Sequence, residues 1–339
     1  MKFGKVDLEE AEGAILAHSV ALSSGRLRKG QVLSADDISA MAEAGMTEVI
    51  VARLAPGDID ENTAAARVAA ALVPDPDAAN LQITEAFTGR VNLLATGPGV
   101  VRLDAARLQA LNRIDPMLTL ATVPNYRQMS AGGMVATVKI ISYAVPGSAV
   151  EAAESLLADA PSLRLERTRL CTARLIVTQI PGGAGEKGVK AIRDRVEALG
   201  MDLTETRTVA HDRAALTAEL QKDAPEDLVL ILTGSATSDP DDVAPGAVRD
   251  AGGQVTRFGM PVDPGNLLFL GDLSDRPVIG LPGCARSPSL NGADWILSRI
   301  ACGLPVSGDD IAGMGVGGLL KEIPTRPQPR DRSRRLNKP

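Results

Sequence analysis

The alternation of strand-like and helix-like segments after Cys171 constrains the fold of this chain more than any other feature. Residues 173–179 (ARLIVTQ), 203–209 and 228–232 (LVLIL) are predicted strands, and helix-like runs separate them. The consecutive apolar residues of LVLIL are typical of a strand that is buried on both faces. Strands that alternate with helices form a mostly parallel sheet with helices on both sides. We therefore predict an open three-layer α/β domain in the C-terminal half.

The loops at the carboxyl ends of these strands are the predicted ligand site. Ligands of open parallel sheets bind beyond the carboxyl ends of the strands. A glycine-rich turn, residues 181–188 (PGGAGEKG), follows the first strand, and the stretch 233–245 follows LVLIL. A later strand, 278–281 (VIGL), precedes the turn PGCARSP. Function is therefore to be sought in these loops.

The N-terminal half has a different organisation. A chain of 339 residues exceeds the usual size of one domain. We predict a mixed α/β segment over 1–76, a β-rich domain with a linking helix over 77–165, and the α/β domain over 166–322. A smaller mixed α+β region thus precedes the main domain. The basic, Pro-rich tail 323–339 has no apolar period and is predicted to be disordered.

Composition excludes several classes of protein. The formal charge of −6 and the pI near 5.2 argue against a nucleic-acid partner, because phosphate backbones are bound by clustered cations. Three cysteines without a C-x-x-C pair and only two histidines give no spacing for a zinc or histidine-based centre. The first residues lack the apolar run of a signal peptide or membrane helix. A soluble, cytoplasmic protein without membrane contact is expected.

Two readings of the turn 181–188 stay open. Its glycines let the backbone approach a ligand, and the following helix offers N–H groups to an anion. Alternatively, it is only a tight connection between a strand and a helix. The order of its glycines matches neither the dinucleotide pattern G-x-G-x-x-G nor the P-loop.

The stretch 233–245 (TGSATSDPDDVAP) combines small residues, hydroxyls and carboxylates directly after the most apolar strand. Small residues leave space for a ligand above the strand end, where hydroxyls and N–H groups converge. Three carboxylates follow within four positions, at Asp239, Asp241 and Asp242. Alternatively, Asp242 or Asp241 caps the next helix and the remainder is a solvated loop.

The same stretch carries a resemblance to a known family. The run T-G-S-A-T-S-D-P-D-D-V-A-P-G-A resembles the T-G-G-T-G-x-x-P-R-D-V-T-P-E-A signature of the molybdopterin-binding domain. That domain occurs in molybdopterin adenylyltransferase, in molybdopterin molybdotransferase and in related binding proteins. The matching residues are Thr233, Gly234, Pro240, Asp242, Val243, Pro245 and Ala247. The departures, Ser235-Ala236-Thr237 for G-T-G and Asp241 for Arg, weigh against nucleotide chemistry.

Further segments are similar to the molybdotransferase branch of this family. Residues 262–271 (VDPGNLLFLG) and 278–288 (VIGLPGCARSP) resemble its K-P-G-K-P…G and G-L-P-G-N-P-V-S segments. Cys284 stands in place of Asn and Ala285 in place of Pro, whereas Ser287 is at the family serine. Glu186, in the glycine-rich turn, is near the usual Asp. The resemblance covers most of residues 171–318.

The resemblance implies a pterin ligand and a set of contact residues. A pterin edge presents a donor pair that a carboxylate accepts in a bidentate manner; Asp242 is the first candidate and Asp239 the second. Arg286 forks onto a phosphate or molybdate, or else is a surface arginine near a helix start. The predicted cofactor-binding residues are Gly182, Gly183, Gly185, Glu186, Thr233, Gly234, Ser235, Ala236, Thr237, Asp239, Asp242, Pro282, Gly283, Arg286 and Ser287. No catalytic residue is assigned.

Three functions are compatible with these residues. The first is binding of molybdopterin or the molybdenum cofactor during its biosynthesis or hand-over, beside a cofactor cytidylyltransferase or a molybdoenzyme as partner. The second is a transferase of the same pathway, for adenylyl transfer or molybdate insertion, with Mg²⁺ held by Asp239, Asp241 and Asp242. The third is an unrelated nucleotide-binding regulatory module, which fold alone does not exclude. The family alone suggests a homo-oligomer.

Overall fold

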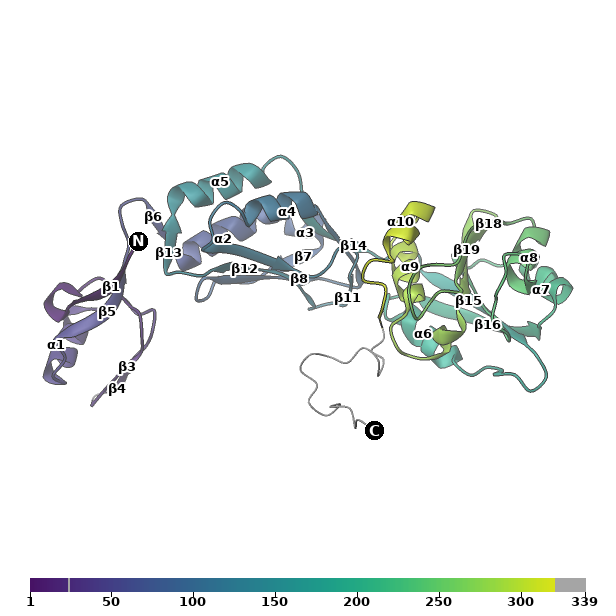
Figure 1. Cartoon of the computed structure of the whole chain (residues 1–339), viewed down its shortest axis with the longest axis horizontal. Helices are drawn as coiled ribbons and strands as arrows, with labels where there is room; N and C mark the ends of the chain where they lie inside the picture. The colour runs from purple at the N-terminus through teal and green to yellow at the C-terminus, as the bar shows by residue number, and fades with distance from the viewer. Residues whose placement is uncertain (24, 321–339) are drawn as a thin grey trace, which may run out of the picture. The chain divides into compact units, whose positions relative to one another are not determined.

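The computed structural model describes residues 1–23 and 25–320 (Figure 1). The predicted disordered tail 323–339 lies outside the described residues. Two compact units make up the chain. Unit 1 contains residues 1–97 and 101–166, and unit 2 contains residues 98–100 and the chain from Arg167 onward. Among the described residues, no helix is long and apolar enough to cross a membrane.

The first part of unit 1 is a small antiparallel sheet beside one helix. The sheet has the order β1-β5-β2, and β3 and β4 form a separate hairpin. The helix α1 begins with a capping box, in which Ser34 and Asp37 each bind the other's backbone N–H. Leu16, Leu33 and Met41 are among the residues of its apolar core. The elements are β1 (Lys2–Asp7), η1 (Leu8–Glu10), β2 (Ile15–Leu16), β3 (Val20–Leu22), β4 (Gly25–Leu27), α1 (Ala35–Glu43) and β5 (Glu48–Arg53).

The second part of unit 1 is built on a four-stranded antiparallel sheet of order β10-β12-β8-β7. Smaller sheets have the orders β11-β9-β14 and β13-β6. The elements are β6 (Asp58–Asp60), α2 (Glu61–Leu72), α3 (Pro76–Ala79), β7 (Leu81–Ile83), β8 (Arg90–Ala95), β9 (Gly99–Leu103), α4 (Ala105–Leu111), β10 (Leu118–Thr122), β11 (Gln128–Met129), β12 (Met134–Ile140), β13 (Ala144–Pro146), α5 (Gly147–Leu157) and β14 (Leu163–Arg167).

Helix α2 packs with this second part. Ala65, Val68 and Leu72 join the apolar core that β8 and β12 form, and α2 also packs against α5. Arg67 of α2 donates two hydrogen bonds to Glu154 of α5, at 2.9 and 2.7 Å. The apolar face of α2, which lies within the predicted segment 1–76, contributes to the core of residues 64–165.

Unit 2 contains a six-stranded sheet of order β16-β15-β17-β20-β19-β18. The first four strands are parallel, β19 pairs antiparallel with β20, and β18 pairs antiparallel with β19 at one edge. The elements are β15 (Thr172–Gln179), α6 (Val189–Glu197), β16 (Asp202–Ala210), α7 (Arg213–Leu220), β17 (Leu228–Leu232), α8 (Val243–Asp250), β18 (Gln254–Phe258), β19 (Phe269–Leu273), β20 (Arg276–Leu281), η2 (Gly283–Arg286), α9 (Gly292–Ala301) and α10 (Gly308–Gly313).

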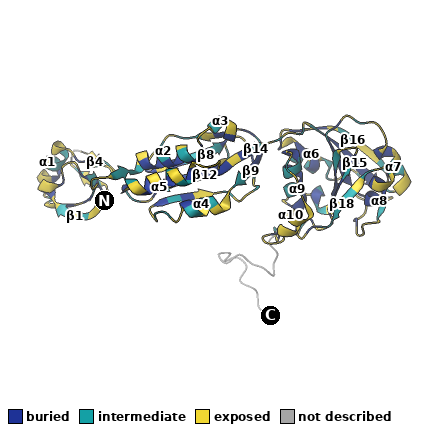
Figure 2. Ribbon diagram, turned by 90° about the horizontal axis from the view of Figure 1, so that it is seen from above, coloured by how far each residue is buried: buried dark blue, intermediate teal, exposed yellow. Residues whose placement is uncertain are grey.

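Helices cover both faces of this sheet. Alternate residues of β17 belong to different cores: Leu230 packs on the side of α6 and α9, and Ile231 on the side of α7 and α8. All five residues of β17 are fully buried. Figure 2 colours the buried stretches of this unit's ribbon dark blue. The predicted open three-layer domain with a mostly parallel sheet is therefore confirmed.

Candidate functional site

Three loops leave the sheet at the same edge, after β15, β17 and β20. Parallel pairing places Val177 of β15 beside Leu232 of β17, and Leu232 beside Leu281 of β20. Because these residues are level, the loops that follow begin beside one another. The predicted stretches 181–188 and 233–245 and the turn 282–287 therefore begin as neighbours at the carboxyl edge of the sheet.

Arg286 connects all three loops. Its Nη1 donates to the carbonyl oxygens of Gly185 (3.1 Å) and Lys187 (2.5 Å), and its Nη2 donates to that of Thr233 (2.9 Å). The side chain is partly buried, and this desolvation lowers the pKa of the guanidinium. Three of its five N–H donors are thus bound to backbone, and two remain.

Gly188 is part of the same junction. Its φ of 95° lies in the left-handed region, and a Cβ built on it would lie 2.5 Å from the Cα of Arg286. Only glycine therefore allows the start of α6 to lie against the loop that follows β20.

Thr178 of β15 and His211 were not predicted as site residues. They link β15 and the start of the second loop to the end of β16. The Thr178 hydroxyl accepts a hydrogen bond from the Gly234 N–H (2.9 Å) and lies 2.8 Å from Nδ1 of His211. The contact between Thr178 and His211 is a hydrogen bond in either direction, because a hydroxyl both donates and accepts. His211 directly follows β16, and that position at a strand end was the available signal.

Close packing makes Gly234 necessary at the start of the second loop. A Cβ at this position would lie 2.7 Å from the Thr178 carbonyl oxygen and 3.2 Å from the Ile180 nitrogen. Thr233 and Thr237 are buried, with hydroxyl oxygens 3.3 Å apart, so these two side chains face each other inside the loop. Ser235 and Ala236 are exposed and form its outer rim.

The three carboxylates of this loop have separate partners. Asp242 caps α8, because its Oδ1 accepts from the Val243 N–H (2.7 Å) and its Oδ2 from the Ser238 N–H (3.1 Å). Asp241 lies 3.3 Å from Arg249, and Asp239 accepts from the Asp241 N–H. Among the described residues, no group of three or more His, Cys, Asp or Glu is placed to hold a metal ion.

The glycine-rich turn has the backbone conformation that its sequence requires. Gly182 and Gly185 have φ values of 72° and 55°, in the left-handed region. Gly183 and Glu186 are exposed, and the Glu186 carboxylate lies 3.5 Å from the Thr208 hydroxyl of β16. The turn therefore exposes backbone groups to solvent, and the Glu186 carboxylate lies beside β16.

Arg195 of α6 anchors the third loop to that helix. Its guanidinium donates to the carbonyl oxygens of Ala285 (2.9 Å) and Ser287 (2.7 Å), and pairs with Asp294 at 2.7 Å. Pro282 is buried, and Gly283 and Ser287 are exposed. Burial raises the pKa of the Cys284 thiol, so this residue is a neutral thiol rather than a thiolate at neutral pH.

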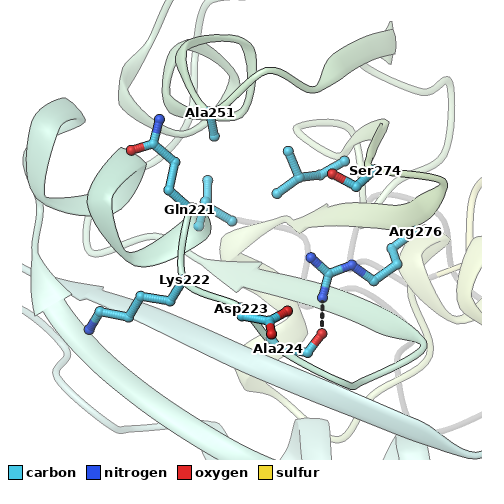
Figure 3. Close-up of a pocket in the computed structure, with 9 residues that line it drawn as sticks. Gln221, Lys222, Asp223, Ala224, Ala251, Ser274 and Arg276 are labelled. Atoms are coloured by element: carbon cyan, nitrogen blue, oxygen red, sulfur yellow. Dashed lines mark hydrogen bonds between the residues drawn. The ribbon is translucent and has the colours of Figure 1, made fainter.

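A cavity of about 420 Å³ lies at the opposite edge of the same sheet (Figure 3). It is formed where α7 and α8 end and where β20 begins, with Asp223, Ala251 and Arg276 among its lining residues. Arg276 donates to the Ala224 carbonyl oxygen at 2.5 Å. This cavity is at the amino ends of β17 and β20, so it is separate from the three loops.

Comparison with known families identifies the domain that carries the loops. Residues 174–298 match the model of a family described as "Probable molybdopterin binding domain". Residues 5–53 match a second family, described as "Domain of unknown function (DUF8806)". The comparison with curated proteins gave no match. The resemblance found in the motifs of residues 233–247 and 278–288 is thus confirmed for the C-terminal domain.

Two solved structures are similar to the chain at low identity. One is a molybdopterin biosynthesis MoeA protein from Pyrococcus horikosii, with 13% identity and a TM-score of 0.32 over 89% of this chain and 75% of that one. The other is a molybdenum cofactor biosynthesis protein from Pyrococcus furiosus, with 12% identity and a TM-score of 0.25 over 92% of this chain and 65% of that one.

Proposed function

We propose that the C-terminal domain binds molybdopterin or the molybdenum cofactor, in the biosynthesis or hand-over of that cofactor. The observation that carries the proposal is the family match over 174–298, which includes all three loops at the carboxyl edge of the sheet. A ligand site at that edge is also what a parallel sheet favours.

A carboxylate on the second loop suits the pterin ring. The ring edge offers an amino group and an N–H, and a carboxylate accepts from both. Asp242 is the proposed contact, with Asp239 as the alternative. Each oxygen of Asp242 already accepts one backbone N–H, and a carboxylate has about four acceptor positions in total, so capping and ligand binding are compatible.

Donors for the phosphate of the ligand come from all three loops. The exposed backbone of Gly182 and Gly183, the Ser235 hydroxyl and the Ser287 hydroxyl are proposed as neutral donors. Arg286 retains two N–H donors beyond its three carbonyl contacts. Its main proposed role is to hold the first and third loops against Thr233, which keeps the donors of the site in place.

The second loop supports binding of the cofactor without a chemical reaction on it. Where the family signature has G-T-G, this loop has an exposed serine and alanine followed by a buried threonine. Asp241, at the position of the usual arginine, pairs with Arg249. A cation available for nucleotide phosphates is therefore missing from that position.

A cytidylyltransferase or a molybdoenzyme is the proposed partner that receives the bound cofactor. The proposed assembly of the chain is a homo-oligomer.

The test is an anaerobic titration of the full chain with purified molybdopterin, followed by absorbance and calorimetry. Saturable binding with one site per chain is expected. Asp223→Asn is the matched control for Asp242→Asn, because Asp223 lines the cavity at the opposite edge of the sheet. Absence of binding would contradict the proposal, and weakening by Asp223→Asn alone would place the ligand at that other cavity.

A further inference from the structure

A segment of the N-terminal part carries only positive charge in a chain that is acidic as a whole. Between Glu12 and Asp36 the sequence contains no Asp or Glu, and its charged residues are Arg26, Arg28 and Lys29. The whole chain has a formal charge of −6. This local excess of cations lies within residues 5–53, which match a family of unknown function.

The β3–β4 hairpin gathers these cations on one face. Its pairs are Val20↔Leu27, Ala21↔Arg26 and Leu22↔Gly25. Val20, Leu22 and Leu27 pack on the apolar core of this part of unit 1. Successive residues of a strand point to opposite faces, so Arg26 of β4 projects away from that core, and Arg28 directly follows the strand. Both are exposed.

Ser19 completes the outer face of the hairpin. Its hydroxyl oxygen accepts a hydrogen bond from the Lys29 N–H at 3.0 Å, so its own proton is directed elsewhere. Ser19, Arg26, Arg28 and Lys29 together line a concavity of about 590 Å³, which we call the cationic pocket. Among the described residues, no carboxylate lies within salt-bridge distance of these three cations. Arg26 and Arg28 therefore have no salt-bridge partner among the described residues, whereas Lys29 interacts electrostatically with Glu61, and Ser19 adds one hydroxyl donor.

We propose that the cationic pocket binds a small molecule through a phosphate group. A guanidinium presents a planar fork that matches two oxygens of a phosphate. Residues two positions apart lie at most about 7 Å apart along the chain, so Arg26 and Arg28 can bind one phosphoryl group between them or two linked ones. Lys29 adds a point charge, and its ammonium lies 5.6 Å from the centre of the Tyr143 ring, an arrangement that restricts its position.

A small ligand fits this surface better than a polyanion. Nucleic-acid surfaces engage many phosphates with many cations. The cationic pocket has three, within a chain whose net charge is negative and repels a polyanion at longer range. The proposal is independent of the molybdopterin site, because none of its residues belongs to unit 2.

The experiment is a titration of the ¹⁵N-labelled full chain with sodium pyrophosphate at low ionic strength, followed by amide NMR. Saturable shifts are expected at Ser19, Arg26, Arg28 and Lys29, and added salt should weaken them. The double variant Arg26→Gln/Arg28→Gln should weaken binding by at least roughly tenfold, because it removes both forks. The control Arg90→Gln/Arg113→Gln removes the same charge from other exposed arginines and should bind normally.

Three results would overturn the proposal. The first is a set of shifts that does not saturate. The second is equal loss of binding in the control variant, which would indicate a response to net charge alone. The third is a single-stranded oligonucleotide that shifts the same amides at lower concentration than pyrophosphate. If the glutamine variant unfolds the hairpin, Arg26→Lys and Arg28→Lys keep the charge without the fork, and the proposal then requires each to weaken binding.

Discussion

At the scale of single residues, several polar side chains of the candidate site bind backbone groups. Arg286 holds carbonyl oxygens of two other loops, Asp242 caps α8, and Thr178 joins Gly234 to His211. Such contacts fix the positions of groups that a ligand would meet. The sequence offered the cap by Asp242 as one reading, because that cap is local, but it did not predict the partners of Arg286 or Thr178, which lie far from them in the sequence.

Replacing Arg286 by lysine should loosen the three loops. A lysine has one compact ammonium and cannot reach carbonyl groups of two separate loops as a planar fork does. The loss of charge-assisted hydrogen bonds should lower the free energy of unfolding of unit 2 by about 1–2 kcal/mol. Trp295, the only tryptophan of the chain, is in α9 and reports urea unfolding of this unit. Hydrogen exchange of residues 183–188 should also become faster.

Arg207→Lys is the matched control for this prediction. Arg207 is exposed on β16 and pairs with Glu205, an arrangement that contributes little to stability. Its replacement should leave both the urea transition and the exchange rates unchanged. Equal effects of the two substitutions would mean that Arg286 has no special positioning role.

Asp242→Asn should keep the capping of α8 by this side chain and remove its proposed contact with the pterin. Asparagine is a good N-cap, so the free energy of unfolding should stay within about 0.5 kcal/mol of the parent. An amide offers one acceptor oxygen in place of two, so affinity for molybdopterin should fall by at least roughly tenfold. Calorimetric titration measures the affinity, and urea unfolding the stability. Unchanged affinity would show that Asp242 serves only to cap α8.

At the scale of elements, the start of β15 depends on one carboxylate. Oδ2 of Asp227, which precedes β17, accepts hydrogen bonds from the N–H groups of Cys171 (2.7 Å) and Thr172 (2.9 Å), and from the Thr172 hydroxyl. These bonds lower the pKa of Asp227 below its ordinary value of 3.8. The two central parallel strands are thereby held level at their amino ends, which sets where the carboxyl-edge loops begin.

The stability of unit 2 should consequently fall in acid. Because the folded-state pKa of Asp227 is depressed, its contribution is present above the unfolded value near 3.8 and is lost as the pH falls through the folded value. Asp227→Asn should lower the free energy of unfolding by about 1–2 kcal/mol at pH 7 and flatten the acid dependence below pH 4. Urea unfolding monitored by Trp295 at several pH values measures both. An unchanged acid dependence would argue against this role.

The edge strands show where sequence patterns were insufficient. LVLIL predicted β17 to the residue, since a fully apolar run leaves few alternatives. The antiparallel pair β18–β19 was not predicted. β18 reads QVTRF, a short segment with polar residues, and it is a strand because β19 supplies hydrogen-bond partners on one side. Pairing between segments separated by a loop is a tertiary property.

At the scale of the whole molecule, the cores of the two units are separate. The apolar cluster around Leu93 contains only residues of unit 1, and the clusters around Leu230 and Ile231 contain only residues of unit 2. Each unit thus buries its own apolar surface. Separate cores favour separate unfolding transitions, because cooperativity is carried by shared contacts.

Leu93→Ala should therefore leave unit 2 unaffected. Leu93 is 0% exposed, and its truncation should lower the free energy of unfolding of unit 1 by about 2–5 kcal/mol. The urea transition monitored by Trp295 should not move, whereas far-ultraviolet circular dichroism should show an earlier phase. Leu230→Ala, at an equally buried position of unit 2, should shift the Trp295 transition. Parallel shifts in both variants would show that the units unfold together.

The sequence by itself determined the class of the C-terminal fold, the loops that carry the candidate site and the family they resemble. Local patterns suffice for these features: apolar runs, glycines at turns and a signature that is contiguous along the chain. Only the tertiary structure decided that Arg286 spans three loops, that Thr178 orients His211, and that α2 packs with the second core of unit 1. Each of these features depends on groups brought together from different strands, and their partners are set by pairing and packing rather than by neighbours in sequence.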